Sequence, residues 1–293
     1  MTVTLENSLY KVEFSTKGAE IQSFVRKDDG SDIVWKGDSS VWKNHAPILF
    51  PFIGRCVGGY YDIEGLHAEY SRNHGFARDV EHALKEQSSD RVVFELKADE
   101  STLLRYPYHF LLVTEYVLTE KGLNWKLKVE NQDQKEFGFS IGTHTAFAGN
   151  ISDCVVEFEK KTPLTGIRCT PEGFVAPFIN GKPDTFTYGE KNPGIVNIPQ
   201  DGFGNGHLVL NNGSEWISLT DTKTGKKSVI QTEGFKYIML WQNTSGPAQF
   251  ICIEPWHGLP DASNTDHIWL NKPELIFLKP GKTFECTQNL WAE

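Results

Sequence analysis

A single carboxylate lies inside an apolar segment near the end of the chain. Glu254 interrupts the sequence FICIEPWH (residues 250–257), and a proline follows it directly. A charged carboxylate is unfavourable in apolar surroundings unless it is hydrogen-bonded, shares a proton or contacts a ligand. Two histidines have comparable settings, His74 in NHGFAR (73–78) and His144 in GTHTAF (142–147). One buried carboxylate with one or two imidazoles is enough to move protons on a small polar molecule, so proton transfer is the predicted chemistry.

His144 has a functional and a structural interpretation. In a strand over residues 139–148, it shares a face with Ser140, Gly142 and Ala146, because alternate residues of a strand point to the same side. These small side chains leave room above the sheet for a ligand. The structural interpretation is a buried histidine bonded to a backbone carbonyl, with the free space taken by a neighbouring tryptophan.

Glu254 also has two interpretations. Both faces of its strand are apolar, so burial would raise the pKa of the carboxyl towards the range useful for a base at neutral pH. The structural alternative is an ion pair with Arg55, Arg78 or another arginine. Arg55 ends the segment APILFPFIGR (46–55), whose two prolines indicate an irregular wall and not a central strand.

Other side chains near these motifs are candidates for binding. A guanidinium such as that of Arg55 binds sugar hydroxyls or phosphate, or it pairs with a carboxylate structurally. Aromatic rings stack on the apolar faces of sugars, although most tryptophans of a β protein belong to its core. Trp241 and Trp256 are close in sequence to the Glu254 strand and are placed near the site, whereas Trp125 is predicted to be core.

Composition excludes several classes of partner. The chain has 293 residues and a net charge of -9, and its longest basic block is Lys226-Lys227, which argues against nucleic-acid binding. No secretion signal and no bilayer-spanning apolar run is present, so we expect no membrane partner. The histidines lack metal-ligand spacing, and we therefore expect no metal and no cofactor.

The cysteines indicate the location of the protein, and its surface composition indicates its oligomeric state. Its 5 cysteines are scattered and include no CxxC pair, which is typical of free thiols in a reducing cytoplasm. We therefore predict a cytoplasmic location. The acidic charge and the lack of an evident apolar stripe give no reason for an obligate oligomer, so a monomer or weak homodimer is expected.

The whole chain alternates short strand-like runs with turn signals. Leu123, Trp125, Leu127 and Val129 alternate with polar residues at a period of two. Similar runs cover 91–97, 109–119, 155–159, 215–219, 226–232 and 237–241. Turns rich in glycine separate them, and no helical periodicity lasts beyond about two turns.

This pattern predicts one antiparallel all-β domain over residues 1–293. The chain is too long for an immunoglobulin-like sandwich and suits two large packed sheets better. The segment 170–206 is rich in Pro, Gly and Asn and is the longest predicted irregular connection. Long loops of this kind often border a binding site.

Four motifs occur together in a familiar order. They are APILFP…GR (46–55), HGFAR (74–78), GTHTAF (142–147) and CIEPW (252–256). With this order and spacing, the chain resembles the aldose 1-epimerase (galactose mutarotase) family, most closely its LacX-like branch. The ends GAEIQSF (18–24) and LKPGKT (278–283) are similar to those of the family as well, so the resemblance covers essentially the whole chain.

The resemblance implies a fold, a reaction and a set of roles. The fold would be a galactose mutarotase-like β-supersandwich, and the reaction would interconvert the α and β anomers of a hexose or related aldose. Glu254 would be the general base and His144 the general acid. His74, Arg55, Arg78 and Trp241 would bind the substrate.

This sequence also departs from the galactose-type enzymes of the family. Its arginine segment has one arginine where theirs has two, and Trp241 occupies the neighbourhood of an aspartate that binds their substrate. The sugar is therefore open, and Arg55, Arg72 and Arg78 could form an anion pocket for a phosphosugar. A non-catalytic carbohydrate-binding or sensing protein is the main alternative. A glycoside hydrolase is less favoured, because only Asp261 offers a second carboxylate.

Overall fold

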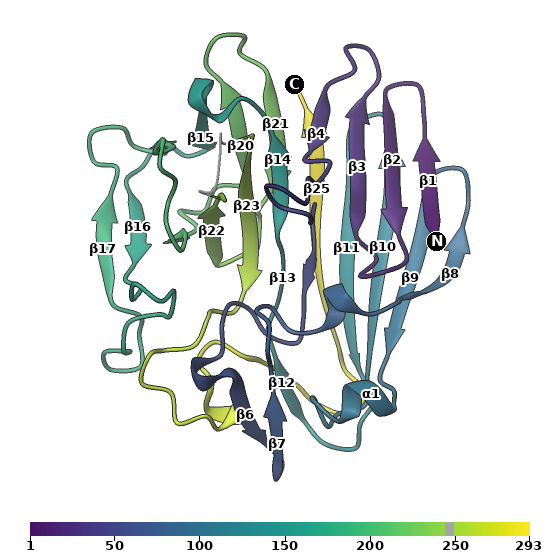
Figure 1. Cartoon of the computed structure of the whole chain (residues 1–293), viewed down its shortest axis with the longest axis vertical. Helices are drawn as coiled ribbons and strands as arrows, with labels where there is room; N and C mark the ends of the chain where they lie inside the picture. Colours follow the sequence, from purple (N-terminus) through teal and green to yellow (C-terminus); the bar gives the residue numbers. More distant parts are fainter. Residues whose placement is uncertain (244–248) are drawn as a thin grey trace.

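Two large antiparallel sheets make up most of the protein (Figure 1). The computed structural model describes residues 1–243 and 249–293. The larger sheet has 12 strands and the smaller has 9, which confirms the predicted all-β sandwich. The one α-helix of the described residues is α1 (Glu100–Leu103), a single turn. No helix in these two stretches has the length and apolar character that crossing a membrane requires.

The larger sheet carries the candidate site. Its order is β1-β2-β3-β4-β14-β23-β22-β19-β16-β17, and β13 joins it through β23 with β5 at its other side. Its strands are β1 (Thr2–Glu6), β2 (Tyr10–Ser15), β3 (Ile21–Arg26), β4 (Asp32–Val34), β5 (Ile48–Leu49), β13 (Ile141–Thr143), β14 (Thr145–Ala148), β16 (Leu164–Ile167), β17 (Thr185–Tyr188), β19 (His207–Leu210), β22 (Tyr237–Trp241) and β23 (Phe250–His257).

The smaller sheet lies against part of the larger one. Its order is β18-β15-β20-β21-β25-β11-β10-β9-β8, and two separate antiparallel pairs, β12-β24 and β6-β7, complete the strands. The strands of the smaller sheet are β8 (Ala83–Gln87), β9 (Arg91–Lys97), β10 (Phe110–Thr119), β11 (Gly122–Asn131), β15 (Cys154–Phe158), β18 (Ile195–Asn197), β20 (Trp216–Asp221), β21 (Lys227–Gln231) and β25 (Thr283–Ala292). The separate pairs are β6 (Tyr60–Ile63), β7 (Leu66–Glu69), β12 (Phe137–Phe139) and β24 (Ile276–Leu278). Short 3₁₀ helices cover Val57–Gly59, Ala77–Asp79, Ile151–Asp153 and Trp269–Asn271.

Aromatic side chains fill the space between the two sheets. Figure 1 shows the first strands (purple) in front of β9 and β10 (blue). Phe14 of β2 and Tyr116 of β10 pack with ring centroids 4.5 Å apart, and the Tyr116 hydroxyl donates a hydrogen bond to the Ala19 carbonyl at 2.8 Å. Trp125 lies 5.2 Å from Tyr116 and is fully buried, as predicted for a core tryptophan.

Two predicted segments differ from the structure. The strand expected over 139–148 is divided into the end of β12, β13 and β14. Ser140 and His144 donate their amide hydrogens to the carbonyls of Pro51 and Pro47, and a proline has no N–H with which to return the bond. The stretch 170–206 is also not wholly irregular, because it contains β17 and β18. Both of these strands lie at the ends of their sheets.

Gly75 holds the loop with His74 and Arg78 tightly against the rest of the protein. Its φ is +70°, and a Cβ atom there would lie 2.2 Å from the Phe50 carbonyl oxygen. We expect Gly75→Ala to lower the free energy of unfolding by at least about 3 kcal/mol, since left-handed backbone strain and overpacking add together. Denaturation in urea measures the loss.

Gly30→Ala is the matched control for this prediction. Gly30 has nearly the same φ, +68°, but no atom lies within 4 Å of its added Cβ. Only the backbone strain of about 1–2 kcal/mol should then remain. Equal losses in the two variants would contradict a steric role for Gly75.

Candidate functional site

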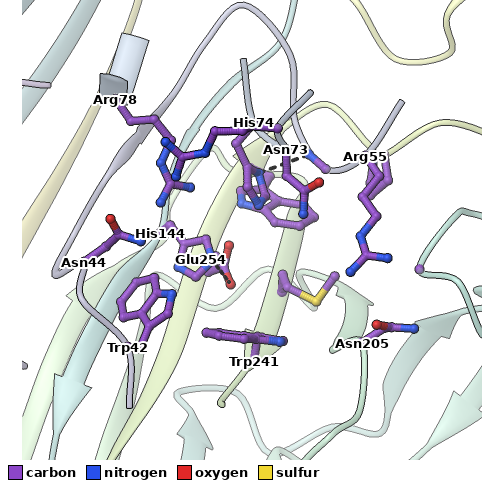
Figure 2. A pocket seen from close by; sticks show the side chains of 16 residues that line it. Trp42, Asn44, Arg55, Asn73, His74, Arg78, His144, Asn205, Trp241 and Glu254 are labelled. Carbon is purple, nitrogen blue, oxygen red and sulfur yellow. Dashed lines mark hydrogen bonds and ion pairs between the residues drawn. The ribbon is translucent and has the colours of Figure 1, made fainter. Parts of the chain in front are cut away.

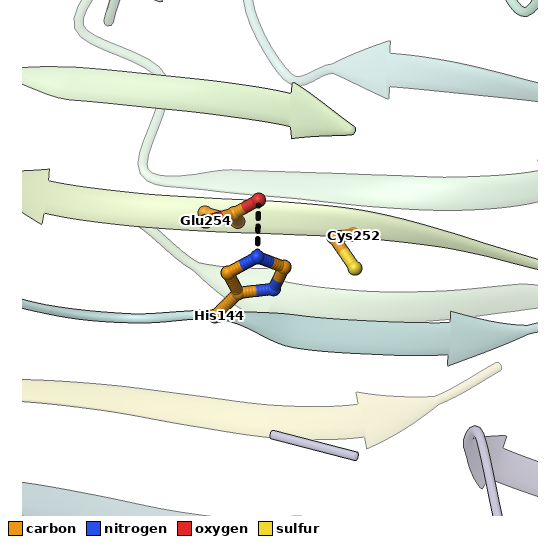
Figure 3. Close-up of side chains that lie close together, drawn as sticks. All are labelled: His144, Cys252 and Glu254. Atoms are coloured by element: carbon orange, nitrogen blue, oxygen red, sulfur yellow. Dashed lines mark ion pairs between the residues drawn. The ribbon is translucent and has the colours of Figure 1, made fainter. Parts of the chain in front are cut away.

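The strand register brings His144 and Glu254 together. β13 and β14 pair with β23 in one continuous register, in which Gly142 faces Trp256 and Thr145 faces Ile253. His144 lies between the two paired stretches and therefore opposite Glu254, with both side chains on the same face. His144 Nε2 is 3.3 Å from Glu254 Oε1 (Figure 3). The two groups therefore lie side by side on one face of the sheet.

A cavity of about 390 Å³ opens above this pair. Its volume is within the range of small-molecule sites. Figure 2 shows Arg78 and Arg55 entering from opposite sides, with the His144–Glu254 pair between them and Trp42 and Trp241 below. All six predicted site residues line this cavity, namely Arg55, His74, Arg78, His144, Trp241 and Glu254.

Aromatic rings enclose the His144 imidazole. Trp42 stacks on it at 5.1 Å with an interplanar angle of 24°, and Trp241 and His74 meet it edge-on at 5.6 Å and 5.3 Å. This burial lowers the pKa of His144 to about 3, and the charge of Arg78 contributes in the same direction. Nδ1 of the ring has no hydrogen-bond partner among the described residues. The structural interpretation, an imidazole bonded to a carbonyl, is therefore not what the structure shows.

Glu254 is 1% exposed and has one oxygen without a partner. Burial raises the pKa of this carboxyl well above its ordinary value, and the nearby charge of Arg78 opposes the shift. No arginine in the part of the chain that the structure describes forms an ion pair with it; its one ionisable contact is His144. Oε2 lacks any hydrogen-bond partner in the same residues. The ion-pair alternative is thus not observed.

His74 is held in one neutral form. Its backbone φ is +70°, in the left-handed region. The Gly54 amide donates a hydrogen bond to Nδ1 of the ring at 3.1 Å. Because Nδ1 is the acceptor, the ring proton is on Nε2. Burial lowers the pKa of His74 well below its ordinary value, so the ring stays neutral. His74 can therefore donate a hydrogen bond to a ligand in the cavity.

The arginines of the site differ in what already binds them. Arg55 donates to the Glu172 backbone carbonyl at 2.9 Å and is exposed, so it does not cap a carboxylate. Arg72 is paired with Asp79. Arg78 makes no ion pair with any carboxylate in residues 1–243 and 249–293, although it is largely buried. Arg55 and Arg78 are thus the cations best placed to bind an anionic or hydroxylated ligand.

The second carboxylate that hydrolysis would need lies outside the cavity. Asp261 is fully buried and pairs with the Lys272 ammonium at 2.6 Å. It also accepts hydrogen bonds from the Tyr61 hydroxyl and, at 2.8 Å, from the Val57 amide. Asp261 is therefore part of a structural network beneath the loops, which leaves Glu254 as the carboxylate that lines the cavity.

Comparison with known proteins shows the family of the chain. The family model described as "Aldose 1-epimerase" matches residues 1–291. The chain belongs to the aldose 1-epimerase family. It is 27% identical over 292 residues to "Protein LacX, chromosomal" of Lactococcus lactis, which covers 96% of this chain and 95% of that protein. This confirms the resemblance to the LacX-like branch.

Solved structures of this family have the same fold. A galactose mutarotase-like protein from Lactobacillus casei is 27% identical, covers 100% of both chains and superposes with a TM-score of 0.92. A galactose mutarotase related enzyme from Lactobacillus acidophilus is 25% identical, with a TM-score of 0.88 and coverage of 100% of this chain and 97% of that one. A more distant relative, a putative glucose-6-phosphate 1-epimerase of Salmonella typhimurium, is 22% identical over 210 residues, 68% of this chain and 66% of that protein.

Sequence reasoning missed several residues of the cavity. Trp42, Asn44, Asn205 and Met239 line it together with the predicted residues. Trp42 and Asn44 shortly precede the motif at 46–55. Their position next to this motif was the only feature of the sequence that could have indicated a place in the site. Met239 faces Glu254 in the register of β22 and β23, so it could be found once the strands were paired. Asn205 lies in the stretch predicted to border a binding site.

His82 anchors the turn that carries Arg78, and its burial predicts a pH dependence. Its Nε2 contacts the Ala77 carbonyl at 2.9 Å, and burial lowers its pKa from 6.5 to about 4. The unfolded chain then binds more protons between these pH values, so stability is full above about pH 6.5 and falls as the pH drops towards 4. We expect a loss of roughly 2 to 3 kcal/mol between about pH 7 and about pH 4.5.

Urea denaturation of the protein and of His82→Gln at both pH values checks this prediction. The amide of glutamine does not titrate, so the variant should lose less stability on acidification by that same amount. An identical loss in both proteins would assign the acid sensitivity to other groups.

Proposed function

We propose that this protein is an aldose 1-epimerase that interconverts the α and β anomers of a hexose or a related aldose. The observation that supports this most is the contact between His144 and Glu254 on the floor of a cavity of suitable size. Each of the two has a buried polar atom without a hydrogen-bond partner among the described residues. Opening of a sugar ring needs one proton removed and one delivered. A directly contacting acid and base can perform both transfers.

In this mechanism, the His144–Glu254 pair carries one transferable proton, which is on His144 before the ring opens and on Glu254 after it has opened. Glu254 accepts the proton of the anomeric hydroxyl while protonated His144 donates to the ring oxygen O5, and the C1–O5 bond breaks. The open aldehyde rotates about its C1–C2 bond. In closure, His144 takes the proton back from the O5 hydroxyl as O5 attacks C1, and Glu254 returns its proton to O1.

The environment of the pair suits this exchange. Burial raises the pKa of Glu254 and lowers that of His144, so both groups favour their uncharged forms in the empty cavity. The charge of Arg78 opposes this shift at Glu254, because it favours the carboxylate, and adds to the shift at His144, because it disfavours the imidazolium. Ring opening starts from the charged pair and ends with the neutral pair, and ring closure reverses this change.

The other residues of the cavity have binding roles in this proposal. His74 donates from Nε2 to an oxygen near the ring, since Gly54 occupies its Nδ1. Trp42 and Trp241, with ring centroids 5.6 Å apart, offer faces to the C–H groups of the sugar. Arg55 and Arg78 hold hydroxyls or an anionic substituent.

We further propose that the substrate is a hexose 6-phosphate. Arg55 and Arg78 line the cavity and pair with no carboxylate of the described residues, which favours an anionic ligand at this place. They provide local positive charge in a chain whose net charge is -9. The name of the Salmonella typhimurium relative refers to glucose 6-phosphate, which agrees with this choice. Removing one charged hydrogen bond, worth about 1.5–3 kcal/mol, should weaken binding by about 10- to 100-fold.

NMR or polarimetry of freshly dissolved α-glucose, α-galactose and their 6-phosphates tests both proposals. The protein should accelerate the approach to anomeric equilibrium, with the highest kcat/KM for a 6-phosphate. Arg55→Gln should reduce this preference by about 10- to 100-fold, and Arg168→Gln, whose guanidinium pairs with Asp184 outside the cavity, should not.

The other outcomes also decide between functions. Tight sugar binding without acceleration would indicate a carbohydrate-binding or sensing protein. Equal rates for the free and phosphorylated sugars would reject the 6-phosphate and keep the epimerase.

A further inference from the structure

A third metal-ligating side chain lies beside the His144–Glu254 pair. Cys252 precedes Glu254 by two residues on β23, and the two side chains therefore share a face (Figure 3). A thiol sulfur, an imidazole nitrogen and a carboxylate oxygen of these three residues lie within 4.8 Å of one another. Among the described residues, this is the one group of three such side chains with that spacing.

The distances are close to those of a tetrahedral metal centre. Zinc bonds of 2.0–2.1 Å to nitrogen and 2.0–2.2 Å to oxygen place the two ligand atoms about 3.3 Å apart. His144 Nε2 and Glu254 Oε1 are 3.3 Å apart. A sulfur ligand at 2.3 Å would lie about 3.6 Å from the nitrogen, and the Cys252 sulfur lies within 4.8 Å of an imidazole nitrogen of His144.

The hydrogen bonding of these groups leaves them available to an ion. His144 Nε2 and Glu254 Oε1 contact each other, and an ion between them would replace this contact. Glu254 Oε2 is buried and has no hydrogen-bond partner in the part of the chain that the structure describes. His144 and Glu254 line the cavity, which gives an ion a path from solvent, and Cys252 lies fully buried behind them. The fourth position of the ion would face the cavity, as in zinc sites that keep one position open.

We propose that His144, Cys252 and Glu254 form an inhibitory site for a thiophilic divalent cation such as Zn²⁺. A thiolate, an imidazole and a carboxylate together favour Zn²⁺ or Co²⁺ over Mg²⁺ and Ca²⁺, which prefer oxygen ligands alone. Binding transfers the Cys252 thiol proton to solvent, with any proton held by the other two ligands. The ion then occupies the lone pairs that would exchange protons with a sugar, and epimerisation stops.

Cobalt absorption tests the site without any activity measurement. The metal-free full-length protein is titrated with Co²⁺ alone, and we expect a thiolate-to-cobalt charge-transfer band together with the visible bands of four-coordinate cobalt. Zn²⁺ should displace the cobalt, and Mg²⁺ should not. Absence of the charge-transfer band would overturn the proposal.

Cysteine variants assign the band to one residue. Cys252→Ala should lose the charge-transfer band and weaken Zn²⁺ binding by at least about 100-fold. Removing a residue that only orients a metal ligand already costs up to about 100-fold in metal affinity, and removing a ligand should cost at least as much. Cys154→Ala is the matched control, since Cys154 is also a buried free cysteine but is not part of this group of three side chains. A band that persists in Cys252→Ala would overturn the proposal. Cys252→Ser, which keeps the volume of the side chain, replaces the alanine variant if the latter does not fold.

Inhibition separates this proposal from the proposed function. Where epimerase activity is found, Zn²⁺ should suppress it in the unmodified protein and in Cys154→Ala, with much weaker suppression in Cys252→Ala. Cobalt bands without any epimerase activity would retain the metal site and reject the epimerase. Epimerase activity that saturating Zn²⁺ leaves unchanged would reject the inhibitory role.

Discussion

Replacing Glu254 with glutamine is expected to slow anomer interconversion by about 10²–10⁴-fold, the usual contribution of a general acid or base. Glutamine has nearly the same shape as glutamate, so the contact with His144 and the packing of β23 should persist. The amide cannot accept the proton of the anomeric hydroxyl. The rate constant from NMR under saturating sugar gives kcat, and the fall should be in kcat more than in KM because the lost interaction belongs to the transition state.

Glu20→Gln is the control for this variant. Glu20 is also a buried carboxylate, 8% exposed, and it accepts hydrogen bonds from the amides of His45 and Ala46 at 2.8 Å and 3.1 Å. Its substitution should lower stability, because two backbone donors lose a charged acceptor, with a much smaller effect on kcat. A Glu254→Gln enzyme within tenfold of the original rate would remove Glu254 from the proposed mechanism.

Strand periodicity predicted the all-β class and the positions of several strands. The runs at 91–97 and 237–241 match β9 and β22 at both ends. Neither alternates strictly, since β9 buries three consecutive residues and β22 is apolar throughout, but polar residues lie close to both ends of each run. Other runs differ from the structure by one or two residues at their ends. The short strands β17 and β18 were missed because Pro, Gly and Asn surround them and edge strands bury little apolar surface.

The arrangement of the site depends on which strands and segments lie next to one another, and a single sequence does not contain this information. The small face at Gly142 and His144 was predicted to leave room for a ligand or for a tryptophan, and both occur at different positions. Trp256 packs over Gly142, whose added Cβ would lie 2.7 Å from the indole, and the cavity opens at His144. Trp42 could not be assigned, because its contact with His144 joins segments about one hundred positions apart with no shared periodicity.

Replacing His144 with asparagine is expected to lower kcat by about 10²–10⁴-fold while the protein stays folded. Asparagine keeps a polar group beside Glu254, but it cannot deliver a proton to the ring oxygen. The same anomer assay measures the rate, and thermal unfolding checks the fold. His257→Asn is the matched control, since this histidine also lies in aromatic surroundings on β23, 4.5 Å from the ring of Phe235, and does not line the cavity. If His144→Asn alone unfolds the protein, the histidine has a structural role instead.

The double variant Glu254→Gln/His144→Asn tests whether the two residues act as a unit. Groups that exchange protons in the same step give non-additive effects, because the second substitution has little left to remove once the first has disabled the transfer. The double variant should therefore be about as slow as the slower single variant, not slower by the product of the two factors. A multiplicative loss would show that each residue contributes independently, for example by binding different parts of the sugar. That result would contradict the exchange of protons between neighbouring groups 3.3 Å apart, which the strand register places opposite each other.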